Sequence, residues 1–163
     1  MSSTTDRQSS LPRWSVQDVH ESFDSRSFSD SMERAGANVA RLEALFETHN
    51  IRSIDPHTPT TQDGAAADEV IQAFNHTVDE QDILISYIYA TVSTDSRHEQ
   101  AQGLLSEMED LDARISPLLA RLADWVASLD SHALKEVSLE AREHLGPLLR
   151  LQDRAIHQMS EAE

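Results

Sequence analysis

Two histidine–glutamate pairs are the parts of this sequence closest to a catalytic metal motif. The zinc motif His-Glu-x-x-His places two imidazoles on one helix face as ligands, with the glutamate beside the metal-bound water as general base. The two candidates here are His20-Glu21-Ser22-Phe23-Asp24 and His98-Glu99-Gln100-Ala101-Gln102. Both lack the second histidine. We therefore assign no metal ligand among the eight histidines of the chain.

Other common catalytic patterns are absent from the sequence. It contains neither a Gly-x-Ser-x-Gly nucleophile elbow nor a glycine-rich phosphate loop. The densest carboxylate groups, Asp79–Asp82 and Glu107–Asp110, are interpreted as solvated helix faces. We therefore predict no catalytic residue and no cofactor-binding residue within these 163 residues.

The net charge of −16 excludes some partners. Nucleic-acid binding needs clustered basic residues, whereas this chain has twelve arginines, one lysine (Lys135) and 29 acidic residues. This balance fits a protein that works at high salt, where screening weakens the repulsion between carboxylates. A GC-rich genome, which favours arginine over lysine, is the alternative explanation. With no cysteine, the chain has neither a disulfide nor a cysteine-based zinc site.

Apolar residues recur in steps of three and four almost throughout the chain, which predicts an all-α fold. We expect an antiparallel bundle of about four long helices, over residues 25–50, 65–94, 95–129 and 139–158, with a short helical turn from Asp130. Ser25 is the expected N-cap of the first helix, and Asp95 or Ser96 that of the third. Pro117 should kink the third helix without dividing it. Gly146-Pro147 could bend the last helix.

The N-terminal residues 1–10 are predicted to be a disordered tail, because they have no apolar core and do not match a secretory signal. Residues 11–24 form an extended lead-in, with Trp14, Val16 and Phe23 as expected anchors. The longest apolar run, residues 83–90, is too short to cross a bilayer. A cytoplasmic location without membrane contact is therefore the expectation.

A set of landmarks over residues 11–163 resembles the N-terminal region of oligoendopeptidase F-type enzymes, within the thimet-oligopeptidase-like zinc metallopeptidases. The first landmarks are Pro12-Arg13-Trp14 and Phe23-Asp24-Ser25-Arg26-Ser27-Phe28, which are similar to the family's opening, although leucine is usual in place of Phe23. Later landmarks follow in the family's order: Leu42–Phe46, His49-Asn50-Ile51, the tyrosine-containing run 83–91, the corner 93–97, Trp125-Val126-Ala127-Ser128-Leu129, Ala141–His144 and His157–Ser160.

This resemblance implies that residues 11–163 are the helical N-terminal domain of a larger peptidase that cuts short peptides. Zinc and the hydrolytic residues would belong to a catalytic domain of the same polypeptide, so this chain alone should be inactive. Neighbours on a helix point about 100° apart. We therefore expect Tyr87 in the core and the more exposed Tyr89 as a contact to substrate in the channel. Ser160-Glu161-Ala162-Glu163 has the pattern of a capping box and predicts that another helix begins there. The alternative is a free-standing helical bundle that acts as a protein-interaction or dimerisation module.

Overall fold

The protein is all-helical in the computed structural model, which describes residues 18–161, with side chains as far as Ala155. Within this range no strand forms, and the backbone makes a single isolated bridge between His57 and Leu129. The predicted tail and the anchors Trp14 and Val16 lie outside the described residues. The described residues form six helices: α1 (Arg26–Thr48), α2 (Thr61–Thr94), α3 (Glu99–Ala127), α4 (Ser131–Val137), α5 (Leu139–Glu143) and α6 (Leu145–Glu161).

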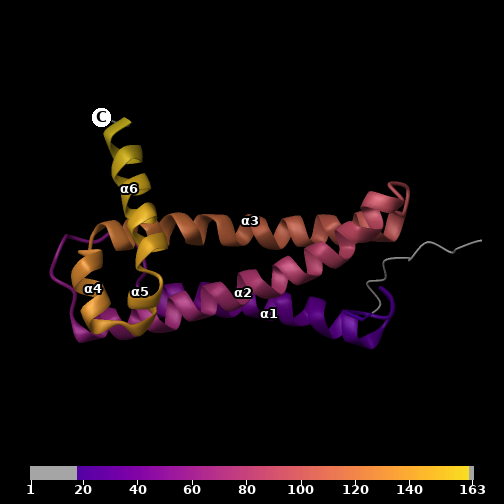
Figure 1. Ribbon diagram of the computed structural model, residues 1–163, viewed down its shortest axis with the longest axis horizontal. Helices are drawn as coiled ribbons and strands as arrows, with labels where there is room; N and C mark the ends of the chain where they lie inside the picture. The colour runs from indigo at the N-terminus through magenta and orange to yellow at the C-terminus, as the bar shows by residue number, and fades with distance from the viewer. Residues whose placement is uncertain (1–17, 162–163) are drawn as a thin grey trace, which may run out of the picture.

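The three longest helices run lengthwise beside one another, and α6 stands across them (Figure 1). The short helices α4 and α5 lie at the end where α2 begins and α3 ends, near the base of α6. The most extensive packing is between α3 and α6 and between α1 and α2. The all-α prediction is therefore confirmed, and the prediction of four long antiparallel helices with a kinked third helix remains a prediction.

Helix α1 begins where the sequence predicts. Its N-cap, Ser25, has extended backbone angles, and its hydroxyl accepts a hydrogen bond from the amide of Phe28. The helix ends at the C-cap His49, and Asn50 follows with a φ of 52°, the left-handed conformation that asparagine tolerates better than most residues. This turn directs the side chain of Ile51 into the core.

Helix α2 begins a turn earlier than predicted, because Thr60 and Asp63 form a capping box. The Thr60 hydroxyl accepts from the Asp63 amide, and the Asp63 carboxylate accepts from the Thr60 amide over 2.7 Å. In the first turn, Gly64 is buried against the end of α4. A β-carbon at this position would overlap the carbonyl oxygen of Val137. This close contact with α4 explains why the first turn of α2 has glycine at position 64.

Helix α3 is continuous through Pro117, as predicted, but its N-cap is neither Asp95 nor Ser96. The prediction was wrong because Asp95 is the C-cap of α2, and its amide donates to the carbonyl of Thr91. The Asp95 carboxylate instead accepts from the amide of Arg97 and shapes the corner. The N-cap is His98, whose Nδ1 accepts from the amide of Ala101.

The predicted last helix over residues 139–158 is divided into α5 and α6. Ser138 caps α5, and its hydroxyl also donates to the Asp68 carboxylate of α2 over 2.6 Å. The division follows from Pro147, which has no amide hydrogen to continue the backbone ladder of α5. Ser160 lies inside α6, so the prediction that a new helix starts there was wrong.

Buried side chains form two clusters along the long helices. One cluster joins α1, α2, α3 and the C-terminal helices around Trp125 and Leu122, and the other joins α1, α2 and α3 around Phe28 and Tyr87. Along α2, the buried polar residues Thr77 and Gln81 lie in sequence between the residues of the two clusters.

Candidate functional site

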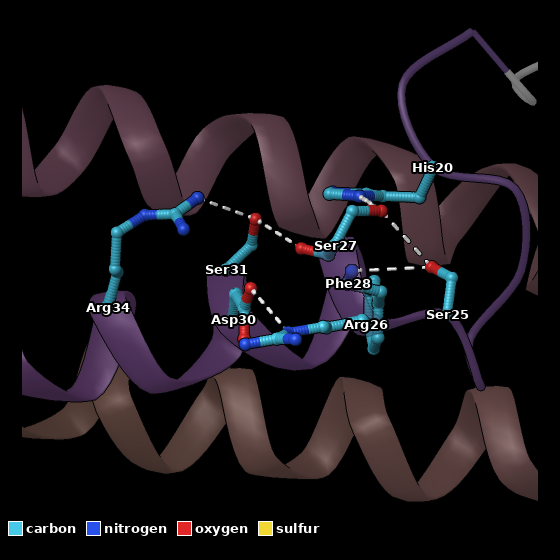
Figure 2. A network of polar contacts seen from close by, with 8 residues as sticks. All are labelled: His20, Ser25, Arg26, Ser27, Phe28, Asp30, Ser31 and Arg34. Carbon is cyan, nitrogen blue, oxygen red and sulfur yellow. Dashed lines mark hydrogen bonds and ion pairs between the residues drawn. The ribbon is translucent and has the colours of Figure 1, made fainter.

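A polar network surrounds the start of α1 and contains the residues that most resemble a catalytic pair (Figure 2). Nδ1 of His20 lies 3.1 Å from Oγ of Ser27, and Oγ of Ser27 lies 3.2 Å from that of Ser25. The Ser31 hydroxyl donates to the Ser27 carbonyl, and Arg34 donates to the Ser31 hydroxyl over 2.8 Å. The network thus links the lead-in to the first three turns of α1.

The His20–Ser27 pair does not have the setting of a nucleophile and its base. Such a pair needs a third group that orients the imidazole. Among the described residues no carboxylate forms a hydrogen bond with His20, and the charge that acts on its ring is the cation of Arg34. Burial, together with Arg34, lowers the pKa of His20. A neutral, buried imidazole beside a helix start is suited to fixing the lead-in against α1.

Aromatic rings at this end of the molecule come from four separate segments. Phe23 packs edge-on against Phe28, Tyr87 and His98, with ring centroids 5.3–5.7 Å apart. His20 packs edge-on against Tyr87 at 5.1 Å. The Tyr87 hydroxyl donates to the His20 carbonyl oxygen over 3.0 Å, and burial raises its pKa. These aromatic contacts join the lead-in, α1, α2 and the start of α3.

The two tyrosines of α2 have different surroundings, as predicted. Tyr87 is buried, whereas Tyr89 is 58% exposed. The exposed ring of Tyr89 is accessible to a partner, and no described residue forms a side-chain hydrogen bond with it.

Both histidines of the His-Glu pairs are used within the fold. The ring of His98 caps α3, and the ring of His20 bonds Ser27. Within the described part of the chain, no group of three His, Asp or Glu side chains lies close enough to hold a metal ion.

Two other histidines contact carboxylates at helix ends. Nε2 of His49 lies 2.9 Å from a carboxylate oxygen of Glu69, next to the C-terminus of α1. Nε2 of His57 lies 3.1 Å from the Asp63 carboxylate. The hydrogen bond to Asp63, with that to the Asp55 carbonyl, raises the pKa of His57. Burial alone would raise the pKa of Asp63, but hydrogen bonds from Thr60 and His57 lower it.

An apolar groove of about 280 Å³ opens where α2, α3 and α6 meet. Its floor is made of buried aliphatic side chains, Ile71, Leu122 and Leu148. Arg150 and Arg154 of α6 line it as well. This groove was not predicted from the sequence. Phe74 of α2 and Leu119 of α3 belong to the apolar pattern of their helices, but the groove forms only where α6 packs beside them.

Next to the groove, His144 is held in one tautomer. Its Nδ1 lies 3.0 Å from the carbonyl oxygen of Glu140 and is placed to donate to it. Nε2 then accepts from the Asn75 amide over 3.1 Å. This contact links the end of α5 to the middle of α2 and fixes one wall of the groove.

No family model, curated protein or solved structure matches this chain. No described helix combines the length and apolar character needed to cross a membrane.

Proposed function

We propose that this chain is the N-terminal helical region of an oligoendopeptidase F-like zinc metallopeptidase. In this proposal the region is not catalytic. It shapes the channel that admits short peptides, and a catalytic domain of the same cytoplasmic polypeptide supplies the zinc and the hydrolytic residues. The long helices α1, α2, α3 and α6, with a bend of α3 at Pro117, would form the channel wall.

The observation that carries the proposal is the meeting of separate sequence landmarks in one aromatic cluster. Phe23 and Phe28 belong to the opening motif, Tyr87 to the tyrosine-containing run, and His98 follows the polar corner. The ring of Phe23 lies 5.3–5.7 Å from each of the other three rings. Landmarks that are far apart in the sequence thus pack on one another, as expected if they are features of one fold.

The later landmarks also meet in the core. Trp125 and Ala141 are both buried in the cluster that joins α3 to the C-terminal helices. His144 bonds Asn75 of α2. These roles are structural, in keeping with a region that lacks a catalytic set of its own. The exposed ring of Tyr89 is the proposed contact with peptide in the channel.

The direct test begins with the coding sequence beyond Glu163. The proposal expects a helix that continues there and, further on, His-Glu-x-x-His with a downstream glutamate ligand. The full polypeptide should then bind zinc and cleave a quenched short peptide in a chelator-sensitive manner. Deleting residues 1–163 should change the range of peptide lengths cleaved more than the rate on the shortest peptide. A reading frame without any zinc motif would overturn the proposal.

A dimerisation module is the second candidate, because one specific patch favours it. Val19 and Ile83 are 49% and 55% exposed and lie together over an apolar hollow beside Tyr87. Exposed apolar patches of this kind often mark interfaces. Sedimentation of the isolated chain should then show a dimer that Ile83→Asp dissociates. Leu139→Asp is the matched control, because Leu139 is similarly exposed, at 58%, but lies on α5 away from this patch.

A further inference from the structure

The groove between α2, α3 and α6 has the shape of a docking site for side chains. Besides its buried floor, it exposes parts of three further apolar residues, one on each helix: Phe74, Leu119 and Leu151. Pockets for small molecules usually hold about 300–1,000 Å³ and enclose most of the ligand. This groove, at about 280 Å³, is at the lower end of that range and is open to solvent. It therefore fits a few side chains of a protein segment better than a whole small molecule.

The charge of the groove is opposite to that of the chain. None of its lining residues is acidic, although the chain has 29 acidic and 13 basic residues. Arg150 and Arg154 are one helical turn apart, so they lie on the same face of α6. Both are exposed, and neither forms an ion pair with a described residue. An acidic segment would be repelled by most of this molecule and attracted here.

We propose that this groove docks an amphipathic helix of the catalytic domain of the same polypeptide. Its apolar side chains pack against Phe74, Leu119 and Leu151, and its Asp or Glu side chains face Arg150 and Arg154. A helix lying in a groove between helices is a common recognition mode, in which apolar anchors fill the floor and charges set the register. The identity of the partner domain depends on the proposed function, and the chemistry of the segment depends on the groove alone.

The test uses the full polypeptide with a photoreactive residue in the groove. Leu119, which is 38% exposed, is replaced by p-benzoylphenylalanine, and the cross-linked peptide is identified by mass spectrometry after irradiation. A second protein carries the same residue at Phe74, where a ring replaces a ring. Both positions should cross-link to one helix of the catalytic domain, at an apolar residue within one turn of an Asp or Glu. The same photoreactive residue at the exposed Tyr89 should not reach that helix.

Charge reversal tests the role of the arginines. Arg150→Glu with Arg154→Glu should lower the yield of the Leu119 cross-link by about fivefold or more, because two favourable charge contacts become repulsive. Arg52→Glu with Arg97→Glu makes the same change in net charge at exposed arginines outside the groove and should leave the yield unchanged. An unchanged yield in the first variant, no cross-link from either groove position, or a cross-link to a segment without carboxylates overturns the inference.

The two proposals can fail separately in one preparation. Zinc content and chelator-sensitive peptide cleavage report on the proposed function, whereas the cross-links report on the groove. A zinc peptidase whose groove reaches no acidic helix contradicts only the groove inference. A full polypeptide without a zinc-dependent activity contradicts the proposed function, and with it the identity of the docked domain.

Discussion

The hydroxyl of Tyr87 on α2 donates a hydrogen bond to the carbonyl oxygen of His20, 67 residues earlier in the chain, over 3.0 Å. This bond is buried and attaches the lead-in to the C-terminal part of the longest helix. It also satisfies a backbone oxygen in a cluster otherwise made of aromatic rings.

Removing this hydroxyl should destabilise the fold. Tyr87→Phe leaves the His20 carbonyl without its partner, and we expect the free energy of unfolding to fall by about 1–2 kcal/mol. Chemical denaturation measures this change. Tyr89→Phe, at an exposed ring two residues later, is the control and should have almost no effect. Equal stability of the two variants would show that the bond contributes nothing.

Two glycines should respond in opposite ways to alanine. Gly64→Ala places a methyl group against the Val137 carbonyl, so the fold should lose about 2 kcal/mol. Nothing lies within 4 Å of a β-carbon at Gly103 in α3, so Gly103→Ala should gain about 0.5–1 kcal/mol through helix propensity. Thermal melts of both variants provide the test, and a stabilised Gly64→Ala variant would contradict the close packing of α2 on α4.

Replacing Gln81 should stabilise the protein. Its side chain is 3% exposed, and its Nε2 has no hydrogen-bond partner among the described residues. Gln81→Met keeps the length of the side chain and removes the unpaired amide, so we expect a gain of about 1 kcal/mol. Gln72→Met, at an exposed position of the same helix, should be close to neutral. A loss of stability in Gln81→Met would reveal a partner for the amide.

The free energy of unfolding should depend on pH through His20 and His57, whose pKa values shift in opposite directions in the folded protein. The pKa of His20 is lowered in the fold, so the unfolded chain binds more protons below the ordinary histidine pKa of about 6.5. The stabilisation from His20 is therefore present above that value and is lost as pH falls. The pKa of His57 is raised, so its stabilisation is present below about 6.5 and is lost as pH rises through the raised value.

Urea unfolding from pH 5 to 8 separates the two effects. His20→Gln should be more damaging at pH 8 than at pH 5, and His57→Gln more damaging at pH 5 than at pH 8. If both variants show the same pH dependence as the parent protein, neither imidazole is linked to folding.

High salt should stabilise the fold if the acidic composition is an adaptation to salt. The net charge is −16, and the screening length shortens from about 10 Å at 0.1 M to about 3 Å at 1 M. Melts followed by circular dichroism in 0.1 M and 2 M potassium chloride measure the shift. Sodium sulfate at matched ionic strength is a poor control because it also strengthens apolar burial, so chloride salts should be compared. An unchanged midpoint favours the compositional explanation.

The sequence by itself determined which segments are helical and which faces are buried. The steps of three and four from Phe28 to Phe46 correctly gave the inner face of α1, and Ser25 its start, because both depend on residues within one or two turns. The same local geometry separated buried Tyr87 from exposed Tyr89.

Contacts between distant segments decided the rest. His98 is the N-cap of α3 because Asp95 is already the C-cap of α2. The start of α5 is fixed partly by Asp68 of α2, which accepts hydrogen bonds from Ser138 and Glu140. The groove exists only because α6 packs against α3 next to α2, so that Arg150, Phe74 and Leu119 line the same hollow. A periodic pattern defines the face that a helix buries, but the angle at which two faces meet depends on the side chains of both helices.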